Sequence, residues 1–332
     1  MILFFLAPAI AELLSGSAPP AEFFNPISLL LLASLYGSGA LVIREMKVRL
    51  SKGYVSMLVL GMVYGIVEEG LMVKSFFDPE WGDLGILGIY GRWQGVNWVW
   101  VEWLTIYHAI FSIAIPITIV ELAYPERRNE SWVGNKKFMG LVVLMGAVTV
   151  FGYLFLTDYR PPFPQYFLSA AIATLLILVA WRIPVNTGRN GILQALMPKK
   201  LLLIGFLTTL TLFMLFMAGP HLINQPPILM ILGAGLLFAI FCFLKRYEWD
   251  EETLYHKFTL ASSAVVFLAA LTPLQELDKS RLDNTRGMLI VGIIALVLLI
   301  LLRLRLKSQM FAREQELEEA TIKGRRARKM KQ

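Results

Sequence analysis

The sequence predicts an all-α, polytopic integral membrane protein with about 10 transmembrane helices. Three observations lead to this class. Of the 332 residues, 57% are hydrophobic and only 17% are charged, where a soluble domain carries about 25% charged residues. The mean hydropathy is +0.62. Long apolar runs recur between short polar or Pro/Gly-rich segments, and backbone inside lipid must satisfy its own hydrogen bonds, which favours helices for runs of this length.

The apolar runs place the spans in order along the chain. Residues 1–14 are too short to cross comfortably, because a crossing takes about 20 residues, so nine spans remain if this segment is re-entrant. Further spans are expected at 26–43, 54–73, 96–120, 138–156, 165–181, 201–218, 228–244, 258–274 and 288–302. Residues 1–302 therefore form a helical bundle with an outer Gly/Trp-rich loop at 75–96, and residues 303–332 form a basic tail.

Basic residues indicate the orientation of the bundle. With the spans alternating in direction, 25 of the 31 Lys and Arg residues fall on one side, and that side is predicted to be cytoplasmic. The chain is thus expected in the cell membrane, multi-pass, with a cytoplasmic C-terminus. The basic tail is expected to contact anionic lipid. No nucleic-acid partner is expected, because no aromatic residues interleave with the basic ones.

Two adjacent glutamates, Glu68 and Glu69, interrupt the apolar run at 54–73. A charged group in mid-span costs about 2.5–3.5 kcal/mol on insertion scales, and intramembrane ionisable residues are by default functional. If Lys74 marks the outer interface, the two carboxylates lie roughly 8–9 Å below it. They are candidates for a binding or proton-coupling site, with bonding to neighbouring helices or to Arg92 as the structural alternative.

The following span carries two more candidates: Glu102, at a depth similar to that of the glutamate pair, and His108, six residues deeper. Consecutive antiparallel spans therefore bring four ionisable groups into one layer near the outer surface. On an ideal helix Glu68 and Glu69 are 100° apart, so not all four side chains can point at one spot. No spacing motif supports a metal site, so neither a metal nor a cofactor is predicted.

The loop between these two spans is rich in glycine and tryptophan. The supporting candidates are Lys74 just before this loop, Arg92 and Trp93 within it, and Trp100 just after it. The tryptophans suit an aromatic belt at the membrane surface, or a cap over the acidic layer. Within the span at 54–73, Gly61 and Gly65 form a small-xxx-small face that lets a neighbouring helix approach.

The pair Glu68-Glu69 followed by His108 resembles, in part, the CAAX-type intramembrane proteases, which carry EExxxR and FxxxH motifs. The chain departs from that pattern at Val73, which occupies the arginine position, and at Leu104, which occupies the phenylalanine position. The resemblance covers a handful of positions and implies a glutamate/histidine hydrolase.

The leading hypothesis is a membrane protein with an outward-facing carboxylate site that binds or transports a small solute, ion or lipid, with a glutamate as proton or cation site. The first alternative is an integral-membrane enzyme in which a glutamate activates water beside His108. The second is a scaffold in which the acids are packing partners. Contact between His108 and the glutamates, and cavities beside them, would separate these hypotheses.

Overall fold

A computed structural model describes residues 1–82, 84–184, 193–194, 196–247, 249, 254–279 and 281–329, with side chains up to residue 309. Within this part, nine helices are long and apolar enough to cross a membrane. The polytopic all-α class predicted from the sequence is therefore confirmed, and the chain contacts the lipid bilayer.

Six of the nine spans are built on one continuous helix each: α8 (Asn135–Phe155), α9 (Phe163–Arg182), α10 (Pro198–Leu222), α11 (Pro226–Leu244), α12 (Leu254–Leu277) and α13 (Met288–Lys329). The other three spans contain a π-helical segment. They are α3 (Pro26–Leu32), η2 (Ala33–Gly37) and α4 (Ser38–Arg49); α5 (Tyr54–Gly65) and η3 (Ile66–Met72); and α6 (Trp98–Tyr107), η5 (His108–Ala114) and α7 (Ile115–Ala123).

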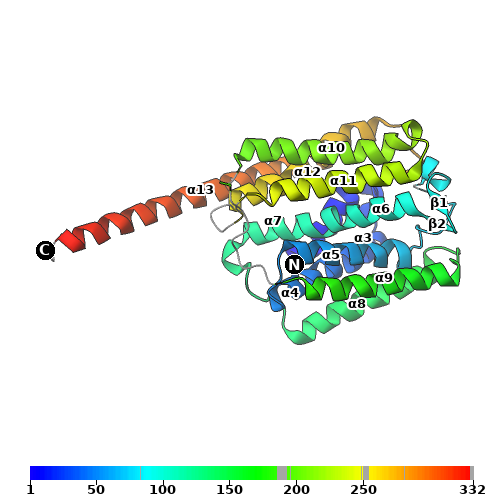
Figure 1. Cartoon of the computed structure of the whole chain (residues 1–332), viewed down its shortest axis with the longest axis horizontal. Coiled ribbons are helices and arrows are strands. Elements are labelled where there is room, and N and C mark those ends of the chain that lie inside the picture. Colours follow the sequence, from blue (N-terminus) through cyan, green and yellow to red (C-terminus); the bar gives the residue numbers. More distant parts are fainter. Residues whose placement is uncertain are drawn as a thin grey trace.

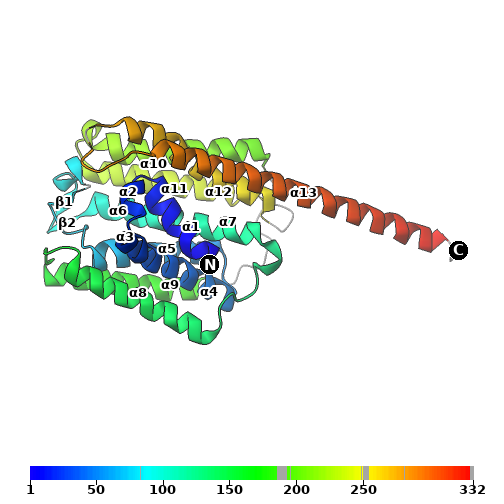
Figure 2. The ribbon, with the colours of Figure 1, turned by 180° about the vertical axis from the view of Figure 1, so that it is seen from behind.

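The helices lie side by side and roughly parallel to one axis (Figures 1 and 2). In Figure 1, α10 to α12 form one side of the bundle, α8 and α9 form the opposite side, and α5 to α7 lie between them. The small hairpin of β1 (Arg92–Trp93) and β2 (Val96–Asn97), paired antiparallel, lies at one end. Helix α13 extends from the opposite end.

The first segment is shorter than a span. Helix α1 (Ile2–Pro8) continues into the π-helical η1 (Ala9–Leu14), and 13 residues of helix reach only about 20 Å. The N-terminus lies partway along the bundle (Figure 2), and α1 packs on η2 and α7. The structure thus agrees with the nine-span alternative.

Asparagine caps set the start of two spans at the end of the bundle that carries the β hairpin. The Asn25 side chain accepts hydrogen bonds from the backbone N–H groups of Ile27 and Ser28, ahead of Pro26 in the first turn. The Asn97 side chain accepts one from the Trp100 N–H at 2.9 Å. Such caps satisfy backbone donors that the first helical turn leaves free.

The two central spans cross at very short range. A Cβ atom added at Gly61 would lie 2.7 Å from the Cα atom of Ala109, and one added at Gly65 would lie 3.1 Å from the Cβ atom of His108. The small-xxx-small face expected at these glycines is therefore a true helix contact. It brings the end of α5 directly against η5.

Short elements complete the fold. These are α2 (Pro20–Phe23), the 3₁₀ turns η4 (Gly85–Gly88) and η6 (Pro125–Arg127), and the hairpin. Helix α13 passes through residues 302–303 without a break, so the predicted bundle and tail share one helix. The expected lipid contacts of the tail concern side chains from residue 310 onward, which lie outside the described part.

Candidate functional site

Four π-helical segments, from four different helices, supply the polar side chains of one cluster. Segment η1 contributes Glu12, η2 contributes Tyr36, η3 contributes Glu68 and Glu69, and η5 contributes His108. Single π turns, with i→i+5 hydrogen bonds, are rare inside α-helices and are frequently found at functional sites. The concentration of four such segments around one group of ionisable residues marks this cluster as the candidate site.

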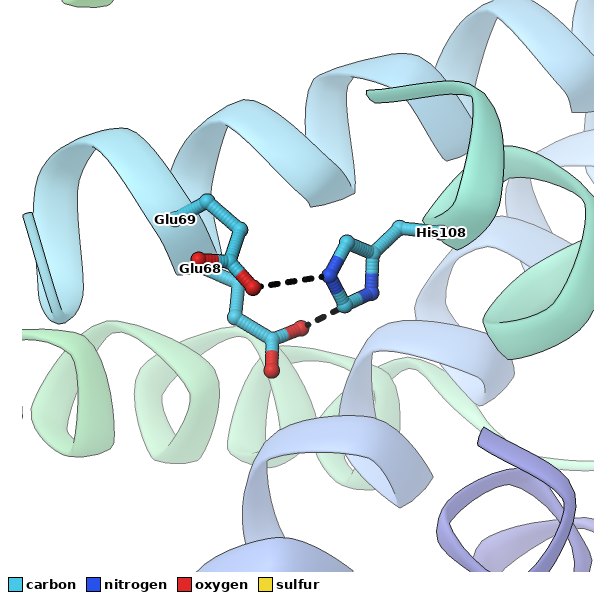
Figure 3. A group of neighbouring side chains, drawn as sticks. All are labelled: Glu68, Glu69 and His108. Atoms are coloured by element: carbon cyan, nitrogen blue, oxygen red, sulfur yellow. Dashed lines mark hydrogen bonds and ion pairs between the residues drawn. The ribbon is translucent and has the colours of Figure 1, made fainter. Parts of the chain in front are cut away.

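The His108 ring faces both adjacent glutamates, which reach it from the same helix (Figure 3). Its Nε2 atom is 3.0 Å from Oε1 of Glu69, and its Nδ1 atom is 3.3 Å from Oε2 of Glu68. Nδ1 is also 2.9 Å from the hydroxyl oxygen of Ser112, one turn further along η5. Both ring nitrogens therefore have polar partners.

A tyrosine joins the third carboxylate to the pair. The Tyr36 hydroxyl contacts both Glu12 and Glu68 at hydrogen-bonding range. A phenolic hydroxyl has one hydrogen to donate, so it can donate to only one of the two carboxylates. The second contact is a hydrogen bond only if the other carboxyl group carries a proton of its own.

The network continues outward from Glu69 to the start of the next span. The Ser75 hydroxyl donates to Glu69, and the indole N–H of Trp100 donates to the same hydroxyl oxygen at 3.0 Å. Trp100, a supporting candidate from the sequence, is therefore connected to the site through Ser75. These outer contacts fix the Glu69 carboxylate beside His108.

The cluster is buried and carries an excess of acidic groups. Only 6% of the Glu68 surface and 2% of the His108 surface is exposed, while Glu12 and Glu69 are partly exposed. Three ionised carboxylates would face at most one positive imidazolium. Buried charge that is not balanced is strongly destabilising, so the site needs added positive charge, as bound protons or as a bound cation.

The fourth candidate, Glu102, lies away from the cluster. Its carboxylate lies against Gly233 of α11, and neither of its oxygens has a hydrogen bond of good geometry. Its depth along the span predicted that Glu102 lies in the same layer as the glutamate pair, but its position on α6 directs the side chain towards α11. Three of the four predicted acid/base residues are thus brought together and one is not.

Two of the remaining supporting candidates, Arg92 and Lys74, donate hydrogen bonds to backbone carbonyls. Arg92 donates to the backbone carbonyls of Phe77, Asp78 and Gly88, so it holds the loop and does not pair with the glutamates. The Lys74 ammonium donates to the carbonyls of Tyr153 and Thr157 at 2.8 and 3.1 Å. Burial, and then the nearby Arg160 charge, lower the pKa of Lys74 below its ordinary value.

The tryptophans of the loop and of the start of α6 differ in their exposure. Trp93 is 67% exposed at the end of the bundle, as in an aromatic belt. Trp100 and Trp103 are buried, and the Trp103 ring stacks on Phe216 at 4.8 Å between ring centroids. The buried pair packs the wall between the candidate site and α10.

Sequence reasoning missed several members of the cluster: Glu12, Tyr36, Tyr64, Ser75 and Ser112. Glu12 had a usable signal, because it is the one charged residue in an apolar N-terminal helix. Tyrosine and serine in apolar helices are common, so the others carried no comparable signal. Their contribution becomes visible only when the helices are packed.

Two surface hollows, of about 440 and 370 Å³, are lined by residues 175–183 and 132–137. Both lie beside the ends of α9 and α8 that are distant from the β hairpin. Neither includes a residue of the candidate site. They therefore supply no route to the acidic cluster, and its proposed role depends on the cluster's own chemistry.

A comparison with protein-family models concerns the part of the chain that builds the site. A family model described as an uncharacterized membrane protein family matches residues 1–218, which include every member of the cluster. An uncharacterized protein of Archaeoglobus fulgidus is 29% identical over 129 residues, which is 37% of this chain and 38% of that protein. The chain thus spans well under half of that relative's length. No solved structure matches.

Proposed function

This chain belongs to the uncharacterized membrane protein family whose model matches residues 1–218, and we propose that it binds a small cation inside the membrane and moves it across, alone or with a solute. One observation carries the proposal: in a buried cluster, Glu68 and Glu69 contact a single imidazole, and Tyr36 links a third carboxylate, Glu12, to Glu68. Such a cluster attracts positive charge, because ionised carboxylates buried without balancing cations are costly.

The proposed site opens to the outer side of the cell membrane. This orientation is supported by the basic residues, which concentrate at the opposite end of the spans, where α13 leaves the bundle. It is also supported by the depth of Glu68 and Glu69, which lie in the last two turns of their span, next to the β hairpin. A scaffold role explains neither the four π-helical segments nor the surplus of acidic groups.

The proposal is tested by cation movement in proteoliposomes. Purified full-length protein is reconstituted, and a panel of gradients (H⁺, Na⁺, K⁺, Mn²⁺ and Zn²⁺) is imposed while ion-sensitive dyes report flux. We expect at least one cation to move faster than in empty liposomes, and Glu68→Gln and Glu69→Gln to reduce that flux at least tenfold.

Glu102→Gln is the matched control, because it removes a carboxylate from the same membrane layer outside the cluster. It is expected to retain wild-type flux. Equal flux in wild type, Glu69→Gln and empty liposomes for every cation would remove the proposal.

A second function, hydrolysis of a lipid or peptide bond, is favoured by the 3.0 Å contact between Nε2 of His108 and Glu69. A carboxylate and an imidazole within hydrogen-bond reach can share general acid–base work on a water molecule. Had His108 lain on another face from both glutamates, this form of the hypothesis would have been excluded. Cleavage of membrane peptides or lipids that is lost in Glu69→Gln, without any cation flux, would favour the enzyme over the carrier.

A further inference from the structure

We propose that the cation bound at this site is a divalent first-row transition metal ion, held by Glu68, Glu69 and His108. The inference rests on the proposed function, because it names the class of cation for the same site. One ligand atom from each of these residues lies within 4.8 Å of the other two. Carboxylate and imidazole donors together suit Mn²⁺, Fe²⁺, Co²⁺ or Zn²⁺, whereas Ca²⁺ and Mg²⁺ prefer oxygen ligands throughout.

The hydrogen bond behind His108 supports a ligand role. Nδ1 lies 2.9 Å from the Ser112 hydroxyl, which can accept the Nδ1 hydrogen. Metal-binding histidines commonly donate their other N–H to such a partner, which fixes the tautomer. In that tautomer the Nε2 lone pair faces Oε1 of Glu69 at 3.0 Å. Two acceptors this close repel each other unless a cation or an added proton lies between them.

Buried polar atoms without hydrogen bonds supply a second, independent observation. Oε2 of Glu68, which lies 3.3 Å from Nδ1 of His108, makes no hydrogen bond of good geometry, and neither does the fully buried hydroxyl of Tyr64. The Tyr64 ring also packs edge-on against the His108 ring, with centroids 5.9 Å apart. Buried polar groups are nearly always satisfied, and a metal ion with its bound water gives both atoms a partner.

Charge balance favours a divalent ion over a monovalent one. Ionised Glu68 and Glu69 together with neutral His108 carry two negative charges, which one M²⁺ ion cancels. Three protein ligands leave coordination positions open for water or for an exchanging ligand, as in catalytic zinc sites. Glu12 lies beyond Tyr36, so it orients the Glu68 carboxylate through that hydroxyl.

Cobalt provides the probe, because its visible spectrum reports the ligand field of the bound ion. Full-length protein in detergent is treated with a chelator, dialysed and titrated with Co²⁺. Bound metal is measured by mass spectrometry and by absorbance. We expect one Co²⁺ per chain, displaced by Zn²⁺. The chain has three histidines, so a His221→Ala/His256→Ala variant tests the assignment while leaving the proposed ligands intact, and it should bind Co²⁺ as wild type does.

Ligand variants then locate the ion. Glu68→Gln, Glu69→Gln and His108→Ala are each expected to weaken Co²⁺ binding by at least about 100-fold, and Ser112→Ala by about tenfold, as for partners that only orient a ligand. Glu102→Gln should bind like wild type. Circular dichroism verifies that each variant is folded, and the His221→Ala/His256→Ala protein gives a result even if a ligand variant fails to fold.

Two results would overturn the inference. In the first, chelator-treated wild type retains no Co²⁺ in the titration. In the second, Glu69→Gln and His108→Ala bind as tightly as Glu102→Gln, which would mean adventitious surface metal. Flux of H⁺, Na⁺ or K⁺ through protein that binds no Co²⁺ would leave the proposed function standing and remove only the assignment of a divalent metal.

Discussion

His108 is the residue whose side chain contacts all three spans of the candidate site. Its ring contacts Glu69 and Glu68 on η3 and Ser112 on its own segment, and it packs beside the ring of Tyr36 on η2. Depth along two antiparallel spans was enough to predict that His108 and the glutamates share a layer. Facing was not predictable, because it depends on local helix geometry.

Lys74 is unusual at the residue scale because it combines burial with a left-handed backbone. Its φ angle is +66°, a region that non-glycine residues seldom adopt, and its side chain is fully buried. The ammonium donates to two carbonyls at the C-terminal end of α8, one in its last turn and one just after it. The chain therefore keeps lysine where glycine would suit the backbone better.

Burial makes stability depend on the protonation of Lys74. Because its pKa is lower in the folded protein than its ordinary 10.5, the unfolded state binds more protons between the two values, and stability should rise with pH in that alkaline window. Asp78 and Asp158 oppose the shift and Arg160 adds to it. We expect the thermal midpoint of wild type minus that of Lys74→Met to increase from pH 8 towards pH 10.5; a constant difference would contradict this.

The π-helical segments explain how Glu68 and Glu69 can face the same partner, which the sequence did not determine. An ideal α-helix separates consecutive side chains by 100°, from which we expected that the four candidate side chains could not all point at one spot. In η3 the wider i→i+5 turn lets both carboxylates contact one imidazole. Segment η5 ends at Ala114, two residues before Pro116, whose missing N–H cannot bond the carbonyl four residues earlier.

The crossing of α5 and η5 gives a stability prediction for an element. A methyl group at Gly61 would lie within 2.7 Å of backbone, and backbone cannot move aside as a flexible side chain can. Gly61→Ala should therefore destabilise the protein by about 1–3 kcal/mol, as other overpacked sites do. The measurement is the thermal unfolding midpoint in detergent.

Gly140 in α8 provides the matched control, because a Cβ atom there meets nothing within 4 Å. Gly140→Ala should be neutral or stabilising by up to about 1 kcal/mol, since alanine has the higher helix propensity. Equal destabilisation by both substitutions would show that the crossing is looser than described.

For the whole molecule, hydropathy predicted the class and each of the nine longer spans to within several residues. It could not decide the first segment, because 13 apolar residues suit both a short crossing and a half-span, and only packing on η2 and α7 separates the two. Nor could it reveal the link between Glu12 and Glu68, which are 56 positions apart in the sequence and are joined through Tyr36.

Membrane orientation is testable at this same scale. In a Cys242→Ser background, Glu80→Cys places a thiol in the loop before the β hairpin, and Asn129→Cys places one in the loop after α7; both positions are exposed. If the basic side is cytoplasmic, an impermeant maleimide should label Glu80→Cys in intact cells and Asn129→Cys only after permeabilisation. The reverse pattern would invert the proposed topology and place the acidic site near the cytoplasm.

Helix α13 runs for 42 residues without interruption, a length of about 63 Å. The hydrocarbon layer takes up only about 30 Å, so about half of the helix extends beyond it. The distance from a fluorophore attached near Lys329 to a second dye in the lipid headgroups would report whether this extension lies along the membrane surface or projects away from it.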